Sequence, residues 1–349
     1  MTDLNTRTPS GDDVTQRAFM KPAFSEDLFE QVLRPENIQA AWKRVRANKG
    51  AAGIDGMTID AFPAWVRSGE WKVVVEELET GHYYPFPVRR VEIDKPDGGK
   101  RQLGIPIVTD RVIQQAIAQV LTPIFDPDFS DNSFGFRPNR NGQQAVKQVQ
   151  GIIKTGRRFA VDVDLSKFFD RVNHDLLMTH LGYKVKDKRL LKLIKRYLRA
   201  GVIDNLLYSE SPEGVPQGGP LSPLLGNIML DPLDKELEKR GHKFARYADD
   251  FTILVKSKRA GERVLHSISR YLQRRLKLIV NTIKSRVVKT NDSKFLGFTF
   301  RAGNIHWHLN TFNYFKQQVR DLTNRNWGVS MRYQLFKLSQ YLRGWINYF

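Results

Sequence analysis

Apolar residues at every second position predict two β-strands, each of which carries aspartates where a buried strand would otherwise continue. The first strand ends at Asp164. The second, Phe251–Val255, directly follows the pair Asp249-Asp250. A period of two is typical of strands, and short polar residues are typical of the turns between them. We therefore expect Asp249-Asp250 to lie where one strand turns back into another.

A period of about 3.6 residues predicts helices elsewhere in the chain. The apolar stripe between Val112 and Leu121 indicates a helix that faces the core. Other segments with this period or with helix-favouring residues are 39–45, 143–153, 221–239, 263–277 and most of the chain from Phe312 onward.

Three further segments have a distinct character. Residues 88–107 predict a β-hairpin, whose turn is Pro96-Asp97-Gly98-Gly99. Residues 133–140 predict a loop that combines two aromatic and two cationic side chains, a combination suited to bases and phosphates. Residues 1–35 are polar and contain three prolines, so we expect a loosely ordered lead-in.

The composition indicates a polyanionic partner. Lys and Arg number 56 against 37 Asp and Glu, which gives a formal net charge of +19. Such an excess favours phosphate binding through counter-ion release, and 11% aromatic residues offer stacking surfaces for bases. The alternative is a basic protein without a nucleic-acid partner.

The chain shows no sign of a membrane or an oxidising compartment. It has no run of about 18 apolar residues and no apolar signal segment near its start. It also has no cysteine, which excludes disulfides and thiolate metal sites and fits a cytoplasmic location.

The aspartates suggest metal chemistry. Neighbouring carboxylates repel and are costly to desolvate unless a cation lies between them, and Mg²⁺ is the hard cation that such oxygens bind at phosphoryl-transfer sites. Each aspartate also has a plain structural interpretation. Asp249-Asp250 suits an ordinary turn, and Asp164 suits a helix N-cap.

Several blocks of the chain resemble one protein family. Tyr247-Ala248-Asp249-Asp250 resembles the signature of reverse transcriptases, and Asp164 with Phe169 resembles their other catalytic strand. More narrowly, the chain is similar to the reverse transcriptase/maturase proteins that bacterial group II introns encode. The blocks that carry this resemblance are residues 101–106, 109–114, 134–138, 169–174, 214–223, 294–298 and 341–345.

The resemblance implies an α+β fold with the architecture of a right hand and the activity of an RNA-directed DNA polymerase. It implies an N-terminal extension at 1–37, fingers at 38–158 and a palm at 159–303, with an antiparallel sheet and helices on one of its faces. A helical thumb, which opens the maturase region, would occupy 304–349. Its partners would be structured intron RNA as template, a DNA primer and dNTPs.

The resemblance also implies residue roles. Asp164, Asp249 and Asp250 would be catalytic and would hold two Mg²⁺ ions, with Mn²⁺ as a substitute. The residues implied for nucleotide binding are Lys95, Arg101, Phe169, Gln217 and Lys284. Those implied for nucleic-acid binding are Arg111, Arg137, Arg140 and Gly297. From the pattern alone, a core residue is the favoured interpretation of Phe169. Gln217 is also explained as a loop residue, and Lys95 and Arg101 are equally well explained as exposed hairpin cations.

Two departures from the family bear on function. The chain stops at Phe349, where longer members continue with a basic maturase segment, and it has no Cys/His endonuclease domain. We therefore expect either a shortened protein or a domesticated relative. Two alternative functions stay open: an RNA-binding maturase without essential polymerase activity, and a host role such as phage defence. The sequence does not predict the oligomeric state.

Overall fold

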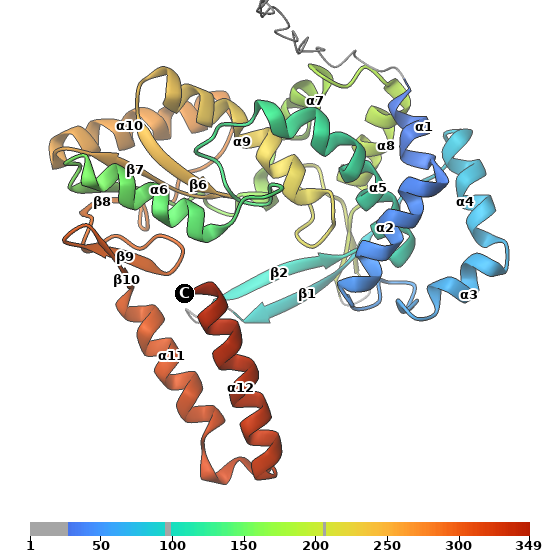
Figure 1. Cartoon of the computed structure of the whole chain (residues 1–349). Helices are drawn as coiled ribbons and strands as arrows, with labels where there is room; N and C mark the ends of the chain where they lie inside the picture. Colours follow the sequence, from blue (N-terminus) through green and yellow to red (C-terminus); the bar gives the residue numbers. More distant parts are fainter. Residues whose placement is uncertain (1–26, 95–98, 205–206) are drawn as a thin grey trace, which may run out of the picture.

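A four-stranded antiparallel sheet lies at the centre of the larger part of the molecule (Figure 1). The computed structural model describes residues 27–94, 99–204 and 207–349. The order of the strands is β6-β7-β3-β8. Their bounds are β3 (Phe159–Val163), β6 (Lys243–Tyr247), β7 (Asp250–Val255) and β8 (Arg286–Lys289).

Both faces of this sheet are covered, which accounts for a buried run from Phe251 to Val255 in β7. On one face α10 (Lys258–Arg275) packs with α9 (Ser222–Lys239). On the other lie α6 (Gly142–Lys154) and the hairpin of β9 (Phe298–Arg301) and β10 (Asn304–Trp307). The predicted antiparallel sheet is confirmed, and α6 adds a helix to the face that we expected to be free of them.

A helical layer joins this sheet to a smaller one. Its centre is α5 (Val108–Phe125), which contacts α1 (Leu28–Leu33) and α2 (Pro35–Ala47). The remaining helices of this layer are α3 (Phe62–Arg67), α4 (Glu70–Glu79), α7 (His174–Gly182) and α8 (Lys188–Arg199). The smaller sheet has the order β2-β1-β4-β5, from β1 (Val88–Asp94), β2 (Lys100–Ile105), β4 (Val202–Asp204) and β5 (Leu207–Ser209).

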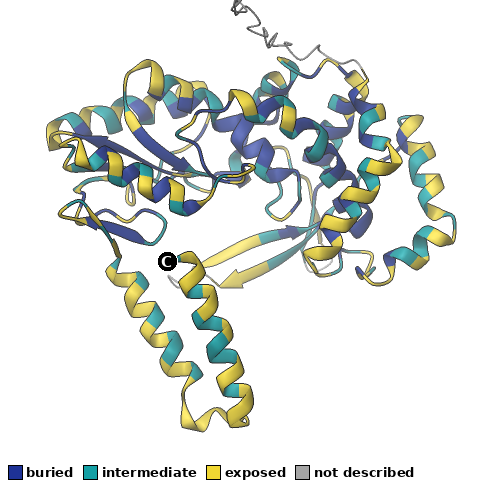
Figure 2. Ribbon diagram, in the orientation of Figure 1, coloured by how far each residue is buried: buried dark blue, intermediate teal, exposed yellow. Residues whose placement is uncertain are grey.

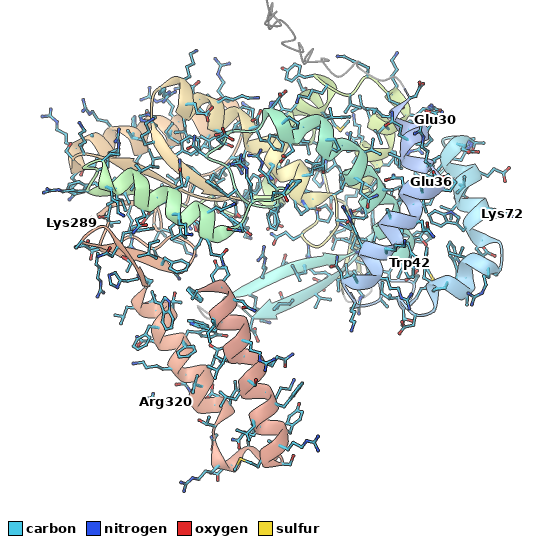
Figure 3. The ribbon with its side chains drawn as sticks, viewed as in Figure 1. Glu30, Glu36, Trp42, Lys72, Lys289 and Arg320 are labelled. Carbon is cyan, nitrogen blue, oxygen red and sulfur yellow. The ribbon has the colours of Figure 1, made fainter. Side chains whose placement is uncertain are left out.

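The chain ends in a two-helix hairpin that projects from the body (Figure 1). It consists of α11 (Leu309–Leu322) and α12 (Met331–Tyr348), neither of which contains a fully buried residue (Figure 2). Aromatic rings fill the space between them, with Trp345 only 4.7 Å from Phe315 between ring centroids. Charged side chains such as Arg320 point outward (Figure 3).

The predicted elements are present with shifted ends. The hairpin at 88–107 is confirmed as β1 and β2, and α10 begins five residues before the predicted helix at 263. The structure differs in part from the loosely ordered lead-in predicted for residues 1–35. Leu28, Phe29 and Val32 are buried on α1, because apolar residues in this short segment pack against the helical layer. Residues 1–26 of that prediction lie outside the described residues.

Candidate active site

Three aspartates meet at one end of the central sheet. The pairing of β3 with β7 ends at Val163 and Phe251, so Asp164, which follows β3, and Asp250, the first residue of β7, lie at the same end of the sheet. Asp249 occupies the two-residue turn between β6 and β7. The charges of these carboxylates act on one another, since Asp164 raises the pKa of both Asp249 and Asp250. The structure therefore brings together the three residues that the sequence indicated.

The protein around these carboxylates disfavours their charged forms. Asp250 is exposed at the end of the sheet, yet the protein atoms packed near its carboxyl reduce its hydration and raise its pKa to about 7. The nearby charges of Asp162 and Asp249 add to the shift. Burial also raises the pKa of Asp249, an effect that the guanidinium of Arg101 partly offsets. Such a site gains from a cation that restores the charge balance.

Asp162 lies on the same strand face as Asp164, but its carboxylate forms hydrogen bonds that hold neighbouring segments together. Its carboxylate accepts hydrogen bonds from Thr252 Oγ1 at 2.9 Å and from Ser293 Oγ at 3.0 Å. These bonds tie β3 to β7 and to the segment after β8, as expected for a polar group that is buried and satisfied. Asp162 thus contributes negative charge to the site while its Oδ1 oxygen holds neighbouring segments together.

The segment before β8 fixes the backbone of Asp164. The Asp164 N–H donates to Ser285 Oγ at 3.0 Å, and the Asn281 N–H donates to the Asp164 carbonyl at 2.8 Å. Lys284 lies in this segment and is exposed, one residue from Ser285. The structure thus places Lys284 beside the strand that carries Asp164.

The turn that carries Asp249 has a strained backbone held by close packing. Ala248 has a φ of +57°, a conformation that costs free energy for residues other than glycine. A Cβ on Gly135 would lie 2.3 Å from the Ala248 nitrogen, so the backbone of the 133–140 loop presses directly on the turn. The close approach depends on glycine at position 135.

A fully buried ion pair lies behind this turn. Arg246 donates to both carboxylate oxygens of Asp234 on α9, with a shortest distance of 2.6 Å, and neither side chain is accessible to solvent. The same guanidinium donates to Ser133 Oγ, Asn227 Oδ1 and the Ala248 carbonyl at 2.7–2.9 Å. One side chain thus connects α9, the 133–140 loop and the turn that holds Asp249.

The sequence analysis did not predict this hydrogen-bond network around Arg246. Arg246 lies beside the tyrosine of the signature, and an arginine inside an apolar strand is a signal that a buried partner must exist. Its partner Asp234 is twelve residues away in sequence on a helix, where acidic residues are common. The pairing therefore required the tertiary structure.

The loop at 214–223 and the hairpin of β1 and β2 meet at the site. Arg101 Nε donates to Gln217 Oε1 at 2.9 Å, and the Gly104 N–H donates to the Gln217 carbonyl at 2.7 Å. Because Arg101 also influences the pKa of Asp249, these two predicted nucleotide-binding residues lie together near the carboxylates. Lys95, which was predicted with them, lies outside the described residues.

Phe169 packs beneath the same loop. Its carbonyl accepts the Val215 N–H at 2.6 Å, and its ring would lie 3.3 Å from a Cβ on Gly226 of α9. The ring is largely buried, so Phe169 is a core residue that retains an edge at the surface. It follows Asp164 by five positions, in a 3₁₀ turn at Phe169–Arg171.

Of the four residues predicted to bind nucleic acid, the three arginines make contacts within the protein. Arg111 is buried and donates to the Ala51 carbonyl at 2.8 Å. Arg137 is buried, and donates to Asp126 and to carbonyls of the 130–133 turn. Arg140 pairs with Asp131 at 2.6 Å. These guanidinium groups organise the loops that border the site.

Gly297 contacts the C-terminal hairpin. It has a φ of +85°, and a Cβ there would lie 3.1 Å from the ring of Phe349 and 3.3 Å from Thr311 Oγ1. Tyr348 anchors the same region, because its hydroxyl donates to the Leu296 carbonyl at 3.2 Å. In this structure the glycine permits close packing of the hairpin on the sheet.

The donor set at the site suits a divalent ion that shares its ligands with a substrate. Among the described residues, no three acidic or imidazole side chains form a complete metal site by themselves. Mg²⁺ in phosphoryl-transfer sites typically takes one or two carboxylates together with substrate phosphates and water. Closely spaced aspartates with raised pKa values at Asp249 and Asp250 fit that arrangement.

An antiparallel sheet with paired aspartates at its end, beside a basic hairpin, is typical of template-directed polymerases. Comparison with known proteins agrees. Residues 93–300 match the family of reverse transcriptases (RNA-dependent DNA polymerases), and residues 312–349 match the maturase-specific domain of group II introns. The chain belongs to the reverse transcriptase family and is of the group II intron type. Its class of activity is RNA-directed DNA polymerisation, and members of the family use divalent metal ions.

The chain is also similar to individual relatives and to solved structures. It is 34% identical to protein YkfC of Escherichia coli over 78% of this chain and 81% of YkfC. It is 36% identical to the group II intron-encoded protein LtrA of Lactococcus lactis over 76% of this chain but only 43% of LtrA. A structure of apo telomerase from Candida tropicalis shares the fold, with a TM-score of 0.50 and 14% identity over 73% of this chain and 57% of that one.

The curated relatives thus differ in how much of their length the chain spans. What LtrA does as a whole protein is not transferred to this chain. Separately, none of the helices in the described ranges is long and apolar enough to cross a membrane.

We predict that Gly135→Ala strongly reduces primer extension. The added methyl group would lie 2.3 Å from the Ala248 nitrogen and would displace the turn that carries Asp249. Gly151→Ala is the matched control, because nothing lies within 4 Å of a Cβ at this position on α6. The control should gain about 0.5–1 kcal/mol of stability, since alanine favours helices over glycine. Equal extension by the two variants would contradict the packing argument.

We predict that Asp234→Asn lowers the free energy of unfolding by about 3–5 kcal/mol, because it leaves the buried Arg246 charge without its partner. Urea unfolding measures this change. The control is Glu236→Gln, which removes only the surface pair with Arg240; exposed pairs of this kind contribute about 0.3–0.5 kcal/mol. Similar unfolding midpoints for the two variants would show that the buried pair is not a stability determinant.

Proposed function

We propose that the aspartate cluster is the centre of nucleotide transfer from a dNTP to a primer on an RNA template. The observation that carries this proposal is the convergence of Asp164, Asp249 and Asp250 at one sheet end, with burial and mutual repulsion acting on the last two. In the reaction, the 3′-oxygen of the primer forms a bond to the α-phosphorus, the bond to the leaving pyrophosphate breaks, and the hydroxyl proton is lost.

Asp164 and Asp249 would hold two Mg²⁺ ions, with Asp250 in support and Mn²⁺ as a substitute metal. When bound, such ions supply the positive charge that the triphosphate and the attacking oxygen require. The protein itself positions the carboxylates that would hold these ions. The hydrogen bonds of Asp164 to the 281–285 segment, and the contact of Arg246 with the Ala248 carbonyl, fix where the two carboxylates lie.

Arg101 and Gln217 form the flank where the triphosphate would bind. Arg101 is exposed, and its charge lowers the pKa of Asp249, so its guanidinium acts electrostatically on the site and is open to solvent. Arginine suits contact with phosphate oxygens. Gln217 orients Arg101 through its side-chain oxygen. Lys284, exposed beside the Asp164 strand, would add a further cation on the opposite flank.

The whole chain would then form a right hand. Fingers at 38–158 would contain the β1–β2 hairpin, the palm at 159–303 the central sheet, and the thumb at 304–349 the helical hairpin. The partners are an RNA template, a DNA primer and dNTPs, and the template is intron RNA if the chain serves intron mobility. The family match and the basic composition support a nucleic-acid partner.

A second candidate function is assistance to intron splicing. One observation favours it: residues 312–349 match the maturase-specific domain, and they form a hairpin whose helices have no fully buried residue. Such a surface is available to a structured RNA. Splicing assays with and without polymerase activity separate the two candidates, because a maturase would act equally well without an intact aspartate cluster.

We predict that Asp249→Ala lowers the rate of primer extension by at least about a thousandfold, because it removes a carboxylate that would hold the ions needed to stabilise the transferring phosphoryl group. Binding of the RNA template should persist, since the substitution leaves the basic surfaces intact. The measurement is extension of a DNA primer on RNA with dNTPs, with and without Mg²⁺. Asp60→Ala, an exposed acidic residue on a loop, is the control and should extend like wild type. Robust extension by Asp249→Ala would refute the site.

We predict that Phe169→Val lowers the selectivity for dNTPs over rNTPs. A smaller side chain beneath the sugar site would accept the 2′-hydroxyl that a phenyl ring excludes. The ratio of the two incorporation rates is the measure, because it does not depend on how much of the variant folds. An unchanged ratio would assign Phe169 to the core alone.

A further inference from the structure

Helix α10 carries a row of cations that the polymerase site does not use. The helix contains six Lys and Arg residues and one acidic residue, Glu262. At about 100° per residue, Arg259, Arg263, Arg270 and Arg274 fall within an arc of about 60°. All four are exposed, and His266 lies in the same row. The row is about 22 Å long, from the rise of 1.5 Å per residue.

This row faces away from the catalytic aspartates. Ile268 and Leu272, on the opposite side of α10, pack in the core that contains Val161 and Ile253. Alternate residues of a strand point to opposite faces of the sheet, so Asp250 belongs to the other face, which α6 covers. The palm sheet therefore separates the arginine row from the site of nucleotide transfer (Figure 1).

The arginines of this row form no ion pair with the acidic side chains of residues 27–94, 99–204 and 207–349. Like charges four residues apart, as in Arg259 with Arg263 and Arg270 with Arg274, destabilise a helix by about 0.2–0.5 kcal/mol per pair. The contact that the row does make is between Arg270 Nη2 and His266 Nε2, at 2.7 Å.

Helix α8 is also basic, and two of its cations are engaged within the protein. Arg189 pairs with Glu30 of α1, and Arg196 lies over the ring of Tyr84 and donates to the Tyr83 carbonyl. These two contacts use charge to hold the helical layer together. Among the described residues, no acidic side chain or aromatic ring engages the four arginines of α10 in this way, so their charge is available to a polyanion outside the protein.

We propose that the arginine row on α10 (Arg259, Arg263, Arg270 and Arg274) binds the phosphate backbone of double-stranded RNA, outside the polymerase cleft. A rigid straight row of guanidinium groups matches regularly spaced phosphates and reads shape rather than sequence. Single strands are typically held by exposed aromatic rings, and α10 presents none on this face. The choice of RNA over DNA rests on the proposed function.

The same face argues against a membrane as the partner. Basic helices that lie on membranes insert large apolar side chains from the face that meets the lipid. No large exposed apolar residue lies on α10. Electrostatic contact with phosphate groups is therefore the interaction that this surface offers.

The test measures binding of a loop-closed RNA hairpin of about 20 base pairs to the full chain, with excess unlabelled template–primer present to fill the cleft. The variant is Arg263→Gln/Arg270→Gln. The control is Arg67→Gln/Lys72→Gln, which removes the same charge from α3 and α4, at the edge of the molecule that carries Lys72 (Figure 3). We expect about tenfold weaker binding by the variant and a salt dependence reduced by about two phosphate contacts. The control should stay within about twofold of wild type.

Three results would overturn the proposal. The first is wild-type affinity for the hairpin in the α10 variant at an unchanged melting temperature. The second is an equal loss of affinity in the control variant. The third is tighter binding of wild type to phosphatidylserine vesicles or single-stranded RNA than to the hairpin. Asp249→Ala should bind the hairpin like wild type. If Asp249→Ala still extended primers, the polymerase assignment would fail while this proposal stood.

Discussion

The placement of the turn that carries Asp249 depends on a single guanidinium group in the interior of the protein. Arg246 pairs with Asp234 on α9 and also donates to the Ala248 carbonyl of the turn. Removing two charges from water is costly, and the pair is tolerated because Asp234, Asn227, Ser133 and a carbonyl satisfy the donors of Arg246. The strained φ of Ala248 persists because this network and the backbone of Gly135 leave the turn no room to relax.

That constraint explains why the acidic site is both organised and electrostatically unfavourable without a cation. The turn and the register of β3 with β7 bring Asp249 and Asp250 beside Asp164, where burial raises the pKa of the first two. A flexible turn would let the carboxylates separate and recover hydration. Rigid packing holds the carboxylates close together, so the site favours binding of positive charge, which a metal ion bound with the substrate can supply.

Much of this was predictable from sequence, for identifiable reasons. The period of two located β7, and the signature Tyr247-Ala248-Asp249-Asp250 located the turn, because both are local patterns. The packing of α6 on the second sheet face was not predictable, since an amphipathic helix does not specify which surface it covers. Nor was the burial of Arg111 and Arg137, because an arginine that organises a loop and one that binds phosphate look alike in sequence.

We propose that Asp164 and Asp249 hold divalent ions together with the substrate. Calorimetric titration of Mn²⁺ into the enzyme, with template–primer and a non-hydrolysable dNTP analogue present, measures this directly. We expect two bound ions for wild type and loss of at least one in Asp164→Asn and in Asp249→Asn. Undiminished binding of both ions by these variants, at an affinity like that of wild type, would contradict it.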